Sequence, residues 1–253
     1  MSLVQFTADD SVGIIRLNRP PVNALSRELV ADIAGAIDEA GHPSLRAIVI
    51  AGGDHFAAGA DIKEFGAVFE GEGEDELAAD LSRAVSRFEQ LDKLTIAAVT
   101  GFALGGGLEL AMGADFRFLA EDAQVGQPEI KLGIIPGAGG TQRLVRIVGW
   151  QRAKDLVLSG RIVAADEAQQ IGLADKVLPA DQVFDAAVAD AKHWAAGPTR
   201  AIAAAKRAML AGFGVEAGLD AEIAEFKALF SSNDAREGVA AFVEKRNPDF
   251  SGN

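Results

Sequence analysis

Cysteine is absent from this chain of 253 residues, and only three histidines occur, His42, His55 and His193. The absence of cysteine excludes disulfides, thiolate nucleophiles and cysteine-ligated metal sites, and so few histidines make a histidine-based hydrolase or metal site a poor candidate. The sequence also lacks an apolar run of the ~18 residues that a membrane span needs. Its first residues lack the basic and apolar stretches of a secretion signal. These absences predict a soluble, cytoplasmic protein that holds no metal.

Basic residues are also scarce: 24 lysines and arginines stand against 37 acidic residues, which gives a net charge of −13. A chain of this charge repels nucleic-acid phosphates and anionic lipid heads, so we expect neither a nucleic-acid nor a membrane partner. The length suits one large domain, or a core domain with a small appendage.

Short β-branched runs alternate with amphipathic segments in the first half of the chain, which predicts an α/β core. The predicted strands cover residues 12–17, 47–51, 95–100 and 116–119, and the predicted helices cover residues 26–40 and 61–65 and a segment that opens at residues 105–107. Beyond residue 142 the pattern is mainly helical. Helices are predicted over residues 144–148, 153–158, 165–171, 183–194, 199–210 and 217–230, with one strand at 175–177.

Small residues cluster directly after two of the predicted strands, at 56–61 and at 101–109. Both clusters precede a helix, where main-chain N–H groups lack intrahelical acceptors. Two such turns that follow neighbouring parallel strands would lie side by side, and each could donate one N–H group to the same oxygen, as in an oxyanion hole. An alternative is that the glycines at 105–107 only allow close packing of helix and sheet.

Two carboxylates stand in apolar surroundings near these turns. Glu109 follows the glycine run in an otherwise apolar helix start, and Glu129 follows Pro128 among apolar neighbours. A buried carboxylate needs a partner or a function. One such group alone could be a cap or an ion pair, whereas two that face one point could hold a water molecule and exchange protons with it.

Four segments together resemble the enoyl-CoA hydratase (crotonase) family, and within it the short-chain enoyl-CoA hydratases. They are FAAGADIKE at 56–64, IAAVTGFALGGGLELAM at 96–112, GQPEIKLGIIPGAGGTQRL at 126–144 and GVAAFVEKR at 238–246. The resemblance spans essentially the whole chain. It implies a crotonase-like stacked β-β-α superhelix with a C-terminal helical trimerisation region. We expect an α/β core over residues 1–195 and the helical region over residues 196–253.

The resemblance also implies the site and the reaction. The oxyanion hole falls on the N–H groups of Ala60 and Gly106, and the catalytic acids fall on Glu109 and Glu129. The implied reaction adds water to a trans-2-enoyl-CoA, giving a 3-hydroxyacyl-CoA, as in fatty-acid β-oxidation. Coenzyme A enters as part of the substrate, and no other cofactor is implied. The family forms homotrimers or dimers of trimers.

The resemblance places the remaining site residues around the substrate. It assigns coenzyme A contacts to Ala58, Lys63, Phe226 and Lys245, and it places Pro136 and Gly137 near the acyl pocket. Lys63 and Lys245 are equally compatible with ordinary solvated surface lysines.

Two other functions stay open at this point. A Δ3,Δ2-enoyl-CoA isomerase would move a double bond without taking up water, and the presence of both acids disfavours it. A non-catalytic relative that binds coenzyme A or RNA is disfavoured by the acidic charge and by the presence of both acids and the glycines.

Overall fold

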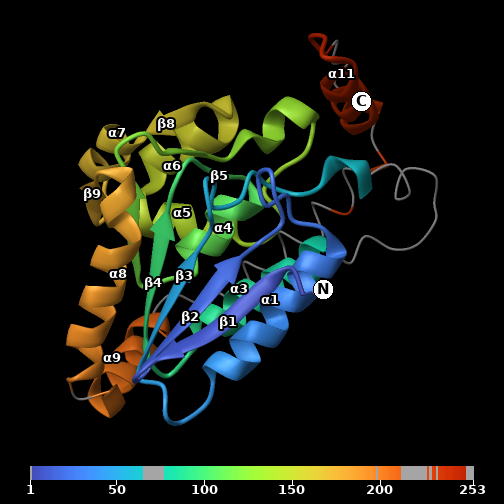
Figure 1. Ribbon diagram of the computed structural model, residues 1–253. Helices are drawn as coiled ribbons and strands as arrows, with labels where there is room; N and C mark the ends of the chain where they lie inside the picture. The colour runs from blue at the N-terminus through green and yellow to red at the C-terminus, as the bar shows by residue number, and fades with distance from the viewer. Residues whose placement is uncertain are drawn as a thin grey trace.

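The computed structural model describes residues 2–64, 77–197, 199–211, 227, 230, 231 and 233–248. Its centre is a six-stranded sheet in the order β1-β2-β3-β4-β6-β9 (Figure 1). The strands are β1 (Val4–Asp9), β2 (Val12–Leu17), β3 (Ala47–Ala51), β4 (Leu94–Val99), β6 (Phe116–Ala120) and β9 (Lys176–Leu178). Only β1 and β2 pair antiparallel; every other neighbouring pair is parallel.

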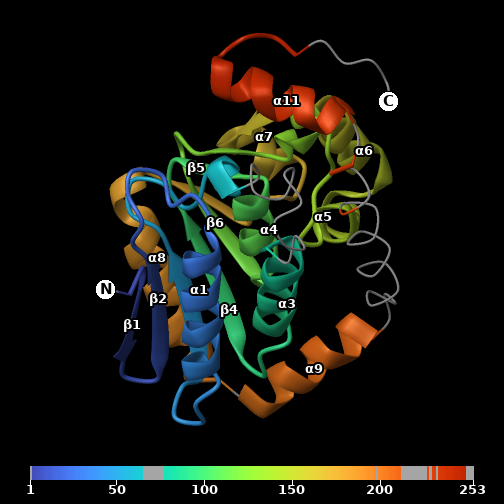
Figure 2. The same cartoon turned by 90° about the vertical axis from the view of Figure 1, so that its right-hand side faces the viewer.

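Helices cover both faces of this sheet. Figures 1 and 2 show α8 (Ala180–Ala195) along one face and α1 (Arg27–Ala40) and α3 (Leu77–Glu89) along the other. Every residue of β3 and β4 is buried, as expected for parallel strands with two covered faces. Helix α1 begins where the Ser26 hydroxyl accepts a hydrogen bond from the N–H of Leu29 at 3.2 Å. The predicted α/β alternation is therefore present.

A second, three-stranded sheet lies beyond the carboxyl ends of β3 and β4. Its order is β5-β7-β8, with β5 (Phe102–Leu104) parallel to β7 (Gln124–Gly126) and β8 (Ile162–Ala164) antiparallel to β7. The helices between and after these strands are α4 (Gly106–Met112), α5 (Gly140–Val148), α6 (Trp150–Ser159) and α7 (Ala165–Gln170). Two successive turns of the chain, β4-β5 and β6-β7, each contribute one strand to each sheet.

Two C-terminal helices lie at opposite ends of the molecule (Figure 2): α9 (Thr199–Ala211) and α11 (Asn233–Glu244). The main chain of helix α11 lies directly against η2 (Pro128–Leu132). A Cβ atom at Gly238 would stand only 2.4 Å from the Leu132 carbonyl oxygen, so glycine allows this close contact. The predicted helix over 217–230 lies almost wholly outside the described residues. The division of the chain at residues 195 and 196 stays a prediction.

Some elements differ from the sequence predictions. The segment 61–65 contains a single 3-10 turn, η1 (Ile62–Glu64), and residue 65 lies outside the described residues. Helix α5 begins at Gly140, earlier than predicted, because Gly139 adopts the left-handed φ of 104° that turns the chain into the helix. Strands β1, β5, β7 and β8 were not predicted. Across the described ranges, none of the helices is both long and apolar enough to span a membrane.

Candidate active site

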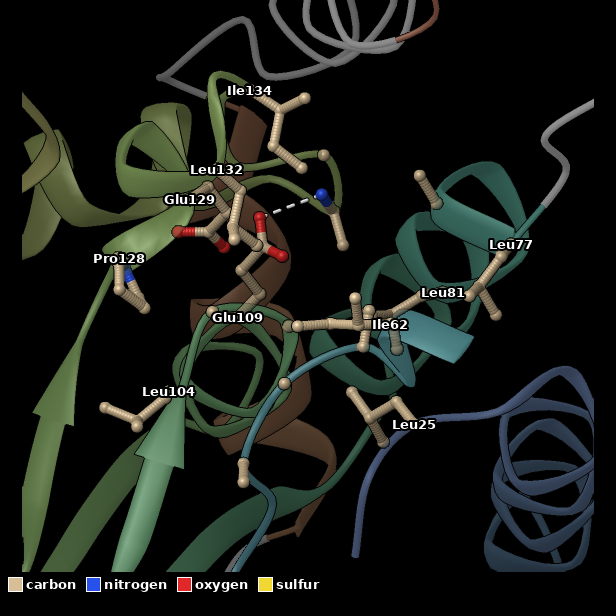
Figure 3. A pocket seen from close by; sticks show the side chains of 18 of the residues that line it. Leu25, Ile62, Leu77, Leu81, Leu104, Glu109, Pro128, Glu129, Leu132 and Ile134 are labelled. Carbon is tan, nitrogen blue, oxygen red and sulfur yellow. Dashed lines mark hydrogen bonds between the residues drawn. The ribbon is translucent and has the colours of Figure 1, made fainter. Parts of the chain in front are cut away.

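A cavity of about 380 Å³ opens beyond the carboxyl ends of β3 and β4 (Figure 3). Most of its wall is apolar. The apolar part includes Leu25, Ile62, Leu77, Leu81, Leu104, Leu132, Ile134 and Phe242. The turns at Ala60 and Gly106 and the charged side chains of Glu109, Glu129 and Lys131 also line it. The four residues that sequence analysis singled out for chemistry therefore meet at one cavity.

The turn at Ala60 leaves its main-chain N–H group outside the local hydrogen-bond ladder. On either side of it, the Leu25 N–H donates to the Gly59 carbonyl at 2.8 Å and the Asp61 N–H donates to the Leu25 carbonyl at 3.0 Å. In a parallel ladder the N–H of the intervening residue points the other way. The Ala60 amide is thus available to a ligand in the cavity.

Gly106 is the first residue of α4, so its N–H group precedes the first intrahelical bond. That first bond runs from the Glu109 N–H to the Gly105 carbonyl at 2.9 Å. Gly105 has a left-handed φ of 51°, and a Cβ atom there would stand 2.7 Å from Glu129 Oε1. Gly105 therefore allows the sharp entry to α4 and the close approach of the Glu129 carboxylate.

The two turns are in direct main-chain contact. The Ala57 N–H donates to the Phe102 carbonyl at 2.9 Å, and the Leu104 N–H donates to the Ala57 carbonyl at 3.0 Å. A Cβ atom at Gly107 would stand 2.0 Å from the Ala57 carbonyl oxygen. The two interpretations of the glycine run thus apply to different residues: Gly107 allows close packing, whereas Gly106 lines the cavity.

Glu109 is 2% exposed, and two main-chain amides fix its carboxylate. Its Oε1 atom accepts hydrogen bonds from the N–H of Ala138 at 2.8 Å and from the N–H of Gly140 at 2.7 Å. Gly140 is the first residue of α5, so the carboxylate also lies at the positive end of that helix dipole. These contacts hold one carboxylate oxygen against the loop that precedes α5.

Glu129 lies in η2, half-buried, and is held by its neighbour Gln127. In the amide orientation that its surroundings require, the fully buried Gln127 side chain donates to Oε1 at 3.0 Å and to Oε2 at 3.1 Å of Glu129. Figure 3 shows the carboxylates of Glu129 and Glu109 close together on the same side of the cavity. This is the placement needed for both acids to contact one small molecule.

A polar network supports the Ala60 turn from behind. Arg19 forms an ion pair with Asp61 at 2.6 Å and donates to the Ala24 carbonyl at 2.7 Å. The Asn23 amide donates to the carbonyls of His55 at 2.8 Å and Phe56 at 3.1 Å. The chain on both sides of the turn is therefore fixed by side chains that do not need a ligand.

Helix α5 contributes positive charge behind Glu109. Arg143 is 2% exposed and pairs with Glu89 at 2.8 Å. Burial lowers the pKa of Arg146 in the same helix, the charge of Glu89 raises that pKa, and the charge of Arg143 lowers it. Because the arginine guanidinium stays protonated in proteins, α5 carries positive charge next to the loop that holds Glu109.

The predicted substrate-binding residues lie in different places relative to the cavity. Ala58 and Gly137 line the cavity, whereas Pro136 is buried behind it, against Gly140. Lys63 in η1 and Lys245 after α11 are both exposed and do not line the cavity. Their contact with coenzyme A stays a prediction. Phe226 lies outside the described residues.

Several residues at the cavity were not predicted from the sequence. Gln127, Ala138 and Gly140 hold the two acids, and Phe242 reaches the cavity from α11. For Gln127 the sequence does contain a signal, because an amide side chain two residues before Glu129 could have been predicted to donate to that acid. Nothing local to Phe242 indicates its place, which depends on how α11 packs. Among the described residues, no three His, Cys, Asp or Glu side chains gather as they would around a metal ion.

Two amides and two carboxylates around an apolar cavity can polarise a carbonyl group and move protons at the adjoining carbons. Comparison with known proteins agrees with this chemistry. Residues 7–253 match the enoyl-CoA hydratase/isomerase family, and the chain belongs to that family.

Named relatives match over nearly the whole length. The chain is 42% identical to a probable enoyl-CoA hydratase of Mycobacterium tuberculosis, over 96% of this chain and 95% of the relative. It is 41% identical to an enoyl-CoA isomerase/hydratase of Mycosarcoma maydis, over 93% of this chain and 91% of that protein. The crystal structure of an enoyl-CoA hydratase from Mycobacterium avium subsp. paratuberculosis superposes with a TM-score of 0.88 at 28% identity, over 98% of each chain. The predicted crotonase-like fold is confirmed.

Proposed function

We propose that the protein adds water across the double bond of a trans-2-enoyl-CoA and releases a 3-hydroxyacyl-CoA. The observation that carries this proposal is the meeting of two carboxylates, Glu109 and Glu129, with the turns of Ala60 and Gly106 at one cavity. The names of relatives 41–42% identical to the chain support the same activity.

The thioester carbonyl oxygen would accept hydrogen bonds from the N–H groups of Ala60 and Gly106. These donors withdraw electrons from the conjugated system, so the β-carbon becomes electrophilic and negative charge develops on the oxygen. Because the donors are fixed main-chain groups, they need no reorganisation as that charge forms. Loss of one such donor typically lowers turnover by about 10²–10³.

The water molecule would lie between the two carboxylates. Glu109 takes one proton from the water as its oxygen bonds to the β-carbon, and electrons move to the thioester oxygen as an enolate. Glu129, protonated at the start, delivers its proton to the α-carbon as the enolate returns to a thioester. The proton on Glu109 then passes to Glu129, which restores both acids, so one water is consumed and an H and an OH are added to neighbouring carbons. The hydrogen bonds from Ala138, Gly140 and Gln127 support a fixed position for both acids on either side of the water. The division of roles between them follows the family resemblance.

A Δ3,Δ2-enoyl-CoA isomerase is the second candidate, favoured by one observation: a relative 41% identical to this chain is named an isomerase/hydratase. The same amides would stabilise the negative charge on the thioester oxygen of a dienolate, while one carboxylate shuttles a proton between carbons. The second acid would then have no necessary role, and so the pair favours hydration.

We further propose that the coenzyme A part lies along Ala58 and that Lys63 and Lys245 contact its phosphates. Phe226 would lie near the adenine, and Pro136 and Gly137 would lie near the acyl chain.

We also propose that the protein forms a homotrimer or a dimer of trimers. The apolar side chains of Phe242 (59% exposed) and Val243 (66% exposed) support this proposal, because they contact water unless another subunit covers them. We propose a cytoplasmic location. The proposed steps use only amides and carboxylates and require no metal or redox cofactor.

The test is to mix the purified protein with a short trans-2-enoyl-CoA and to follow the ultraviolet band of the conjugated thioester. We expect the band to decay to an equilibrium, with a 3-hydroxyacyl-CoA identified by mass spectrometry, and we expect a chelator to leave the rate unchanged. A stable band, together with conversion of a 3-enoyl-CoA to the conjugated thioester, would support the isomerase instead.

A further inference from the structure

The buried guanidinium of Arg143 fastens the loop that holds Glu109. Its Nη1 atom donates to the Ala138 carbonyl at 3.0 Å. On the other side, its Nε and Nη2 atoms donate to the two carboxylate oxygens of Glu89 at 3.2 and 2.8 Å, and Nη2 also donates to the Ser86 hydroxyl at 3.2 Å. Arg143 is therefore fixed to helix α3 at one end and contacts the loop before α5 at the other.

Ala138 connects this arginine with the acid. Its carbonyl accepts from Arg143, while its own N–H donates to Glu109 Oε1 at 2.8 Å. The main chain of Arg143 adds a second attachment, because its N–H donates to the Gly139 carbonyl at 2.8 Å. The side-chain contact therefore acts on the residue whose amide holds the carboxylate.

We propose that Arg143, with Glu89 as its counter-ion, is a positioning residue for Glu109 and acts through Ala138. The kinetic part of this inference rests on the proposed function. An arginine suits this place because its planar fork can bind a carboxylate with two N–H groups and still donate to a carbonyl on another side. A lysine in the same place has one nitrogen and cannot span both partners in this geometry.

Glu89 makes the arrangement possible inside the protein. A buried guanidinium without a counter-ion is strongly unfavourable, so removal of either member alone would disturb folding as well as the loop. The informative variant therefore removes both charges, as Arg143→Met with Glu89→Gln. Arg143→Lys is the conservative partner, because it keeps the charge and loses the fork.

We expect kcat of the double variant to fall by about a hundredfold while KM for the enoyl thioester stays nearly unchanged, because a misplaced acid impairs the chemical step and leaves the ligand contacts in place. Arg143→Lys should retain folding and recover only part of kcat. A double variant whose kcat is that of the wild type would overturn the proposal.

The protein contains a matched control. Arg117 is 6% exposed and pairs with Asp175 at 3.2 Å, and it donates to the carbonyls of Leu173 and Ala114, both at 2.8 Å. It lies opposite Ala97 on β4, short of the carboxyl ends of the strands where the cavity opens. Arg117→Met with Asp175→Asn should lower thermal stability to a similar extent and leave kcat unchanged. An equal loss of kcat in both double variants would mean that Arg143 has only a structural role.

Hydrogen exchange provides a measurement that does not depend on the reaction. The N–H groups of Ala138 and Gly140 are bound to Glu109, so they should exchange slowly in the wild type and faster in the Arg143 and Glu89 double variant, with no change in the Arg117 control. Unchanged exchange of peptides covering residues 134–142 would overturn positioning through Ala138. If the wild type fails to hydrate enoyl thioesters, the proposed function is wrong, and the exchange result still decides whether Arg143 fixes this loop.

Discussion

Gly107 lies against Ala57 so closely that a Cβ atom at Gly107 would stand 2.0 Å from the Ala57 carbonyl oxygen. That carbonyl also accepts the Leu104 N–H, so it cannot move away without breaking the contact between the two turns. At the neighbouring Gly106 a Cβ atom would instead meet the ends of two flexible side chains, Leu81 at 2.9 Å and Leu25 at 3.0 Å. Adjacent glycines therefore have different tolerance to substitution.

We predict that Gly107→Ala destabilises the protein far more than Gly106→Ala does. The added methyl at Gly107 must displace main chain, at a cost at or above the ~1–3 kcal/mol typical of overpacking, whereas at Gly106 the leucine side chains can rotate. Thermal unfolding of the two variants compares them directly. Equal melting temperatures would contradict the close contact between the turns.

The two acids give the second prediction. Glu109→Gln and Glu129→Gln should each lower kcat by about 10²–10⁴, the usual contribution of a positioned acid or base. The amide is nearly the same size as the carboxylate, so binding of a saturated acyl-CoA, measured by calorimetry, should change little. The double variant should be scarcely slower than the slower single variant, since two groups that act on one water are not additive.

Burial of one acid and the pairing of the turns could be predicted from the sequence, for identifiable reasons. A carboxylate at position 109 interrupts an apolar helix start, and the two small-residue turns follow predicted neighbouring strands. β3 and β4 do pair in parallel, which brings Ala60 and Gly106 to one cavity. The chemical roles of these residues, by contrast, came from the family resemblance. The spacing of the glycines and acids alone does not distinguish a hydratase from other enzymes with the same fold.

Contacts between distant segments could not be predicted in this way. Phe242 reaches the cavity only because Gly238 lets α11 pack on Leu132, more than a hundred residues earlier in the chain. Arg143 occupies a helix position where an arginine usually faces solvent, and its burial depends on Glu89 in another helix. β8 has three residues, too few for an alternating pattern to be recognised.

Gln127 gives the third prediction. Its amide donates to both oxygens of Glu129, so Gln127→Met, of similar size and without donors, should remove two hydrogen bonds from that carboxylate. We expect kcat to fall by about tenfold or more while the melting temperature changes little, because the methionine fills the same buried space. Gln127→Glu should be worse than Gln127→Met, since it places a second negative charge against Glu129. A methionine variant with wild-type kcat would mean that turnover does not depend on the hydrogen bonds from Gln127 to Glu129.

Gly140→Ala tests the loop that holds Glu109. A Cβ atom at Gly140 would stand 2.9 Å from Glu109 Oε1 and 2.8 Å from the Pro136 Cβ, so the methyl group must displace the carboxylate or the loop. Displacement of about 1 Å at a reacting group can cost about a hundredfold in rate, and we expect a loss of that order in kcat.

Gly35→Ala is the matched control, because Gly35 lies within α1 with nothing within 4 Å of the added Cβ atom. An alanine there should raise stability by up to about 1 kcal/mol and leave kcat unchanged. Retention of full activity by Gly140→Ala would show that the Glu109 carboxylate tolerates movement, and the hydrogen bonds from Ala138 and Gly140 would then be unnecessary for turnover.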